Sequence, residues 1–161
     1  MAVDMFLHID DLKGESQDSK HKDDIEVLSW SWGAAQHATM TGGGLGAGKV
    51  SIQDITVTKK VDRASPNIFK MCCMGTHLKK GALTVRKAGG DALEYLVIQF
   101  EEMMFTSYSV SGASGDEIIE NISFTFVRCG LTYTPQVGSG SGDAKISGGW
   151  DLQANKEFEP K

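Results

Sequence analysis

The stretch NISFTFV, residues 121–127, alternates apolar and polar side chains along most of its length. Ile122, Phe124 and Phe126 occupy every second position, which places them on one face of an extended chain. A period of two residues is typical of a half-buried β-strand rather than of a helix. We expect this strand to continue to Tyr133.

Similar alternation recurs along the rest of the chain, and turn-forming residues separate the segments. The other expected strands cover residues 5–9, 25–36, 50–57, 83–87, 93–105 with a continuation to 110, and 146–154. One short helix is expected over SPNIFKMCCM, with Ser65 as N-cap, Pro66 at the first helical position and Gly75 after the end. This pattern indicates an all-β fold with one short helix, an antiparallel sandwich or barrel, in a single domain over residues 1–161.

The expected strand 25–36 has two faces of different character. Its apolar face carries the expected core anchors Leu28, Trp30 and Trp32. Two tryptophans on one face can anchor a hydrophobic core because each buries a large apolar area. The other face carries Ser29 and Ser31, which would face solvent in a monomer but could line an opening in an oligomer.

Several segments between the strands are expected to be irregular. The polar residues 14–24 predict a surface loop, and TGGGLGAG, residues 41–48, is too rich in glycine for a regular element, which predicts an extended loop. A phase change in the alternation at Gln53-Asp54 suggests a β-bulge. Gly89-Gly90 between two alternating runs predicts a hairpin turn over residues 88–91.

Composition excludes several classes of protein. The net charge of −5 and the scattered Lys and Arg argue against nucleic-acid binding. The odd cysteine count (Cys72, Cys73 and Cys129) is not a disulfide framework and fits synthesis in a reducing cytosol. The N-terminus MAVDMFLHID lacks the basic region of a signal peptide, and no stretch reaches the roughly 18 apolar residues that span a bilayer.

Residues 43–49 imitate the start of a phosphate-binding loop, because Gly43 is followed at the right spacing by Gly48-Lys49. The required Ser or Thr is replaced by Val50, and a strand is expected next instead of a helix. We therefore expect no nucleotide site and no cofactor.

The other groups that could carry chemistry are also poorly arranged. Cys72 and Cys73 are adjacent on the expected helix and point about 100° apart, so with His77 they would make a poor metal site. Glu101 and Glu102 are neighbours on a strand and should face opposite sides. The remaining histidines, His8, His21 and His37, show no pairing with a nucleophile and are expected to be solvated. We expect neither a metal site nor an enzyme.

An ordered set of fragments resembles the haemolysin-coregulated protein (Hcp) family. In order they are MAVDMFLHID, IEVLSWSWG, the glycine-rich segment leading into GKVSIQDITVTKKVD, SPNIF, GTH, LTVRKAGG, EYLVI and ENISFTF. The match runs from Met1 to about Pro135. Each fragment is weak alone, but the set at these spacings is specific.

The resemblance implies a compact β-barrel of two antiparallel sheets with one helix, similar to phage tail-tube proteins. It implies that six copies form a ring and that rings stack into the inner tube of a type VI secretion system of Gram-negative bacteria. The implied partners are the contractile sheath, the spike and secreted effectors carried in the ring lumen. The implied route runs from the cytoplasm out of the cell without a signal peptide, and it links the protein to virulence.

The resemblance also implies roles for particular residues. Ser29 and Ser31 would line the lumen and contact effectors. The assembly and ring-stacking loops would comprise Thr41, Gly42, Gly43, Gly44, Leu45, Gly46, Ala47, Gly48, Ala88, Gly89, Gly90 and Asp91. From the all-β pattern alone, a monomeric barrel that carries a small ligand in an apolar cavity stays open as an alternative.

Overall fold

The computed structural model describes residues 2–88, 92–138 and 142–161. In chain order the elements are β1 (Val3–Ile9), β2 (Ile25–Glu26), β3 (Ser29–Ser31), β4 (Ala34–Thr41), β5 (Gly44–Ile52), β6 (Ile55–Lys60), α1 (Ser65–Met74), β7 (Leu78–Lys87), β8 (Glu94–Ser111), β9 (Ile119–Tyr133), β10 (Ile146–Asp151) and β11 (Lys156–Glu157). The expected all-β class with one helix is confirmed.

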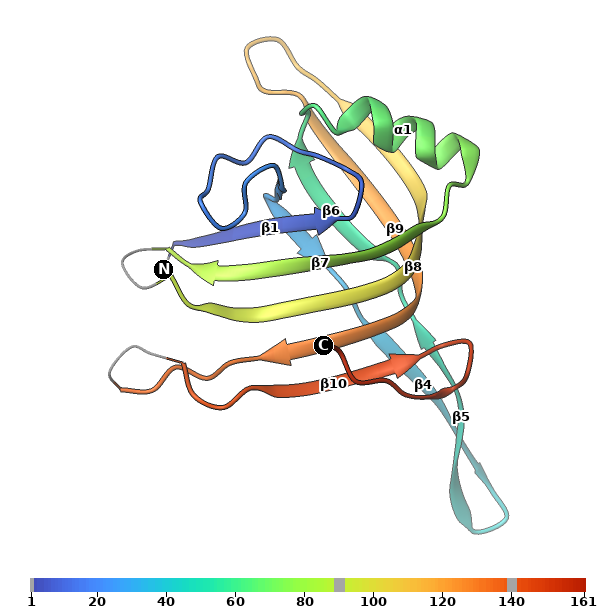
Figure 1. Cartoon of the computed structure of the whole chain (residues 1–161). Coiled ribbons are helices and arrows are strands. Elements are labelled where there is room, and N and C mark those ends of the chain that lie inside the picture. Colours follow the sequence, from blue (N-terminus) through green and yellow to red (C-terminus); the bar gives the residue numbers. More distant parts are fainter. Residues whose placement is uncertain (1, 89–91, 139–141) are drawn as a thin grey trace.

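The long strands β8 and β9 form the centre of the sheet and curve strongly (Figure 1). On one side β8 pairs with β7, and β7 pairs with β1. The two halves of β9 have different second neighbours: residues 119–124 pair with β6, whereas residues 128–133 pair with β10. The sheet therefore divides at β9 into two layers, with β10 and β11 on one and β6 and β3 on the other.

A short segment, residues 25–31, joins the two ends of this sheet. The N–H of Val27 donates to the carbonyl of Met5 in β1 (3.0 Å), and the N–H of Leu28 donates to the carbonyl of Thr58 in β6 (2.8 Å). The pairings thus run from β1 through β7, β8, β9, β6 and β3 and return to β1 through β2.

The interior of this circuit is filled by apolar side chains. Ile122, Phe124 and Phe126 of β9 are buried, as the alternation in the sequence predicts. The rings of Phe100 and Phe124 pack with centroids 4.7 Å apart, and Phe105 meets Phe124 edge-on. Each such buried side chain stabilises the fold by about 1.5–3 kcal/mol relative to exposure.

Helix α1 covers the predicted residues, but its N-cap differs from the prediction. Its N-cap residue is Ala64, and Ser65 is buried and turned toward the protein interior. The N–H of Ala64 donates instead to Oδ1 of Asp62 (2.9 Å). At the other end Gly75 is left-handed (φ 63°), and the N–H of Thr76 donates to the carbonyl of Met71 (3.1 Å), as expected for a glycine-ended helix.

The prediction for residues 25–36 is wrong in two respects. The segment is divided among β2, β3 and β4. Leu28, an expected core anchor, is 47% exposed, whereas its neighbour Val27 is 7% exposed. The reason is the change of partner strand between these two residues, which reverses which side chains face the core. Trp30 and Trp32 are half-buried and pack against the core.

Residues 41–48 are also more regular than expected. They form the outer part of a β4–β5 hairpin, which is a separate two-stranded sheet projecting from the molecule (Figure 1). The turn is Gly42-Gly43, and both residues have positive φ (66° and 91°), as a two-residue hairpin turn with the correct twist requires. The phase change at Gln53-Asp54 is not a bulge but the break between β5 and β6.

Candidate assembly surfaces

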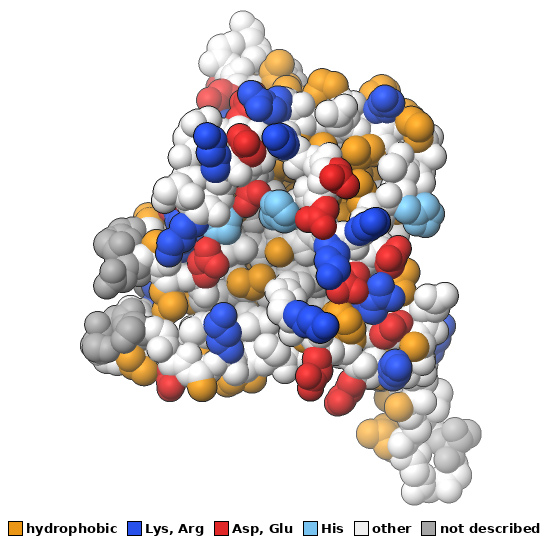
Figure 2. Space-filling view, viewed as in Figure 1, with side chains coloured by type: hydrophobic (Ala, Val, Ile, Leu, Met, Phe, Trp, Pro, Cys, Tyr) orange, Lys and Arg blue, Asp and Glu red, His pale blue; other side chains and the backbone are white. Residues whose placement is uncertain are grey.

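The projecting hairpin has two unlike faces. Met40 and Leu45 are directly opposite each other in the ladder, so their side chains share one face. They are 86% and 76% exposed, and hydrophobic side chains are visible on the hairpin at the lower right of Figure 2. The next paired residues on this face are Ala38 and Ala47. The hairpin therefore presents an apolar face to solvent at its far end.

The expected assembly residues are distributed over this hairpin and a second turn. Thr41 ends β4, Gly42 and Gly43 form the turn, and residues 44–48 belong to β5. A side chain added at Gly42, Gly43 or Gly44 would meet no atom within 4 Å, so this tip touches no other part of the described chain. In the second turn Ala88 is exposed, while Gly89, Gly90 and Asp91 lie outside the described residues.

Ser29 and Ser31 are both exposed on β3, as expected from the sequence. Each begins a row of polar side chains that crosses four paired strands. Ser29 pairs with Thr58, then Asn121, then Ser109. The second row is Ser31, Thr56, Ser123 and Ser107.

These eight residues form a surface that we call the hydroxyl face. It is held together across strands: Thr58 Oγ1 donates to Asn121 Oδ1 (2.6 Å), and the hydroxyls of Thr56 and Ser123 lie 3.0 Å apart. The intervening residues, among them Val57 and Ile122, face the core. The sequence reasoning missed six of the eight members, although the alternation in TVT (56–58), SYS (107–109) and NIS (121–123) carried the signal.

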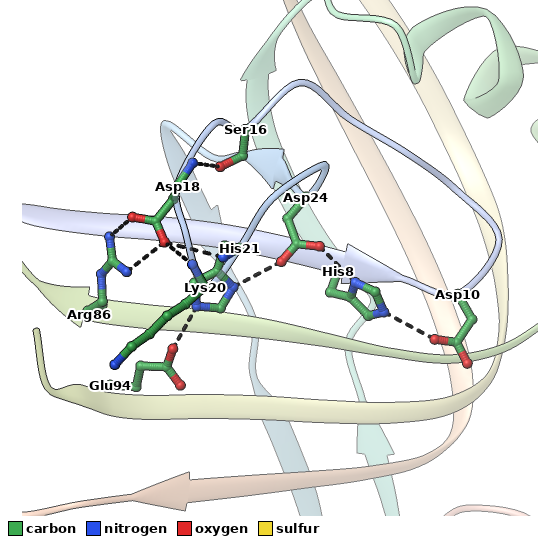
Figure 3. Close-up of polar contacts among 9 residues, drawn as sticks. All are labelled: His8, Asp10, Ser16, Asp18, Lys20, His21, Asp24, Arg86 and Glu94. Carbon is green, nitrogen blue, oxygen red and sulfur yellow. Dashed lines mark hydrogen bonds and ion pairs between the residues drawn. The ribbon is translucent and has the colours of Figure 1, made fainter.

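The loop 14–24 is not a simple surface loop, because an ionic network fastens it to the sheet (Figure 3). Asp24 is buried and accepts from Nδ1 of His8 (2.7 Å) and from Nδ1 of His21 (2.9 Å). The second ring nitrogen of His21 lies 2.6 Å from a carboxylate oxygen of Glu94 on β8, and that of His8 lies 3.1 Å from a carboxylate oxygen of Asp10. The expectation that these histidines are solvated is wrong for His21, whose side chain is 12% exposed.

A second ionic contact fastens the same loop. Asp18 accepts two hydrogen bonds from Arg86 on β7 (2.6 and 3.0 Å), which hold the pKa of the Asp18 carboxyl well below its usual range. The guanidinium of Arg86 lies over the ring of Phe6. The ring of His21 stacks on the ring of Phe6, with the two ring centroids 4.4 Å apart. The loop is therefore anchored by charge and by aromatic packing.

Glu101 and Glu102 were predicted to face opposite sides of their strand, but both carboxylates lie near the same arginine. Glu102 has a left-handed backbone (φ 54°), which breaks the alternation of β8. Arg128 contacts both carboxylates, at 2.8 Å for Glu101 and 3.7 Å for Glu102. Both glutamates are thus engaged in a surface ion-pair cluster.

The residues that resembled a nucleotide site or a metal site in the sequence lie mainly in β5 and in α1. Lys49 lies within β5, and the next element is β6, so the helix that a phosphate-binding loop needs is absent there. Cys72 packs against the core and Cys73 is exposed. Across the described ranges no three His, Cys, Asp or Glu side chains converge to hold a metal ion. In that same part of the chain, no helix has the length and apolar content needed to cross a membrane.

Comparison with known proteins identifies the family. The profile of the family described as "Type VI secretion system effector, Hcp" matches residues 6–133. Protein hcp1 of Pseudomonas aeruginosa is 43% identical over 159 residues, which cover 96% of this chain and 98% of that protein.

Two solved structures support the same assignment. A structure described as a type six secretion system protein superposes with a TM-score of 0.92 at 34% identity, covering 98% of this chain and all of that one. Hcp1 from Salmonella typhimurium superposes with a TM-score of 0.80 at 36% identity, over 98% of this chain and all of that one. The chain therefore belongs to the Hcp family of type VI secretion system proteins.

Proposed function

We propose that this chain is the ring-forming subunit of the inner tube of a type VI secretion system, and that it acts by assembly rather than by catalysis. The observation that carries the proposal is the β4–β5 hairpin, which exposes Met40 and Leu45 at its far end. An isolated two-stranded hairpin is marginally stable in water. Contact with a second copy would cover this apolar face and stabilise the hairpin.

In this proposal six copies close into a ring and the rings stack. Native mass spectrometry tests it, because six copies of 17.4 kDa give a species of about 104 kDa. A peak at that mass supports a closed ring. A monomer peak that persists across concentration and salt would contradict the proposal and favour the monomeric carrier.

The hydroxyl face is proposed to line the lumen and to contact effectors. Its eight side chains are uncharged, and Ser29 and Ser31 extend it to the edge at β3. An uncharged, hydroxyl-rich surface offers weak and exchangeable hydrogen bonds, so a polypeptide could be held without being trapped.

The variant Ser31→Trp tests the lumen. It should leave the ring intact and reduce the retention of effectors measured by co-purification. Ser147→Trp, at an exposed serine of β10 outside the hydroxyl face, is the matched control. Equal retention by both variants would show that Ser31 does not line the lumen.

The proposed partners are the contractile sheath around the tube, the spike at its tip and secreted effectors. The subunit would be made in the cytoplasm and leave the cell through the type VI system without a signal peptide. Secretion that persists in a strain lacking a working sheath would contradict this route.

A further inference from the structure

The loop 14–24 binds three strands through three ionic contacts (Figure 3). The contacts are Asp24 with His8 of β1, Asp18 with Arg86 of β7, and His21 with Glu94 of β8. Arg86 and Glu94 are directly opposite each other in the β7–β8 ladder and form its last described pair before residues 88–91. The loop therefore holds both strands at this end of the β7–β8 pair.

One of the three contacts keeps its charges at every pH near neutrality. The hydrogen bonds from Arg86 hold the pKa of the Asp18 carboxyl well below its usual range. Hydrogen bonds to Asp18 and Asp4 outweigh burial and hold the pKa of Arg86 above its usual range. The contact between Asp18 and Arg86 therefore does not change with pH, and it keeps this part of the loop beside β7.

The contact with β1 does depend on pH. The side chain of His8 is 54% exposed, and its ring nitrogens lie 2.7 Å from Asp24 and 3.1 Å from Asp10. A neutral imidazole has one N–H, so both contacts are hydrogen bonds only when the ring is protonated. Opposite His8, β7 places the uncharged Ala82, so these two carboxylates are the charged groups that act on the ring. The contact is therefore complete at low pH and is weakened when His8 loses its proton.

The state of His8 reaches β8 through Asp24 and His21. Asp24 is buried, and each of its carboxylate oxygens contacts one histidine: Oδ1 contacts His8, and Oδ2 lies 2.9 Å from Nδ1 of His21. The other nitrogen of His21 lies 2.6 Å from Glu94. Asp24 and His21 belong to the same loop, so a loop that is held less firmly at β1 also holds His21 less firmly beside Glu94.

We propose that the loop 14–24 is a proton-sensitive clamp, with His8 as its sensor, that holds the end of the β7–β8 pair at low pH and releases it as pH rises. Protonation of histidine is a common basis for such switches near neutral pH. This end of the pair adjoins residues 88–91, for which the family resemblance implies ring stacking. The consequence for assembly rests on the proposed function: rings persist, but they stack less as pH rises.

Amide exchange measured by NMR from about pH 5 to 8 tests the clamp. The reporter is the N–H of Lys87, which donates to the carbonyl of Leu93 (3.1 Å). Its protection, corrected for the intrinsic effect of pH on exchange, should fall by about tenfold, the effect of losing one hydrogen bond to a charged group. His8→Gln should remove this dependence, and His37→Gln, at an exposed histidine of β4, should keep it. Protection of Lys87 that is the same at every pH in the wild type would overturn the proposal.

The variant Glu94→Ala tests the path to β8. The loop should still respond to pH through His8, but the N–H of Lys87 should not, because the remaining contact with β7 keeps its charges over this range. Glu101→Ala removes a carboxylate of β8 outside the clamp and is the matched control. A pH dependence at Lys87 that is equal in the two variants would overturn transmission through Glu94.

Sedimentation at one fixed protein concentration tests the consequence for assembly. The wild type should form rings of six 17.4 kDa copies, about 104 kDa, at both ends of the pH range, but fewer stacked rings at the higher pH. His8→Gln should stack equally at both. Wild-type stacking that is independent of pH would overturn the effect of the clamp on assembly. Absence of rings at every pH would overturn the proposed function instead, and the amide exchange of Lys87 would still decide whether the clamp exists.

Discussion

The most informative stability experiment concerns an ion pair that is completely buried. Lys59 of β6 and Glu120 of β9 are paired across the sheet, and both side chains are fully inaccessible to solvent. Glu120 also accepts hydrogen bonds from the hydroxyls of Ser65 (2.7 Å) and Tyr108 (2.6 Å). One carboxylate therefore connects β6, β8, β9 and the start of α1.

We expect Glu120→Ala to lower the free energy of unfolding by about 3–5 kcal/mol, because removal of one partner leaves a buried charge without its counterion. Lys59 would retain Asp62 (3.0 Å) and the carbonyl of Lys60 (2.9 Å), which places the expected loss nearer the lower value. For a chain of this length each kcal/mol shifts Tm by about 2–4 °C, so the expected decrease is about 6–20 °C.

The measurement is urea unfolding at one fixed protein concentration, because assembly also stabilises the folded state. Glu117→Ala is the matched control: its carboxylate contacts Lys60 at 2.6 Å, but both side chains are more than half exposed, and such pairs contribute about 0–1 kcal/mol. A loss for Glu120→Ala as small as that of the control would refute the reasoning.

The same variant has a spectroscopic signature. Burial, together with the hydrogen bond to Glu120 and its charge, raises the pKa of Tyr108 to about 12. Removal of Glu120 should lower the pKa of Tyr108 toward the ordinary value of about 10, seen as tyrosinate absorbance at lower pH. An unchanged titration in a folded variant would show that the carboxylate does not control this hydroxyl.

Three further predictions concern other parts of the molecule. Gly81→Ala should cost about 1–3 kcal/mol in urea unfolding, because its Cβ would lie 2.3 Å from the ring of Phe100; a stability equal to wild type would contradict that packing. Gly43→Val should cost the turn about 1–2 kcal/mol at φ 91°, so that amide exchange in residues 34–52 accelerates while the far-UV spectrum of the barrel stays the same. Burial lowers the pKa of His8, but hydrogen bonds and the charges of Asp24 and then Asp10 outweigh it and raise the pKa overall. Its contribution to fastening the loop 14–24 is therefore full below the unfolded value near 6.5 and is lost as pH rises through the higher folded value; exchange protection of this loop should fall over that range, and His8→Gln should abolish the change.

The sequence predicted the strands best where alternate side chains of a segment face one core. In β9 the alternation of Ile122, Phe124 and Phe126 is kept, because all three of these side chains face the same core. The prediction from alternation failed at Val27 and Leu28, where the hydrogen-bonding partner of the chain changes from β1 to β6. Alternation indicates which side chains are apolar, but it does not show that the partner strand changes between two adjacent residues.

The loop 14–24 shows a different reason for failure. Its polar composition resembles that of a solvated loop, yet Asp18 and Asp24 are used to bind Arg86, His8 and His21. These partners come from β1 and β7 as well as from the loop itself, so no local spacing reveals them. Only the fold brings together charges that are as far apart in sequence as Asp18 and Arg86.

The β4–β5 hairpin is the most instructive departure, because the glycine content of residues 41–48 suggested an irregular loop. Strand preference reflects packing of side chains against neighbours more than an intrinsic tendency of the backbone. Gly44, Gly46 and Gly48 give β5 little to pack within its own chain, whereas Met40 and Leu45 provide contacts that the same chain does not use. In the proposed assembly a second copy covers this face of the hairpin, so the neighbours that the hairpin lacks belong to that copy. Rules that compare a segment only with its own chain will then misjudge the very segments through which copies assemble.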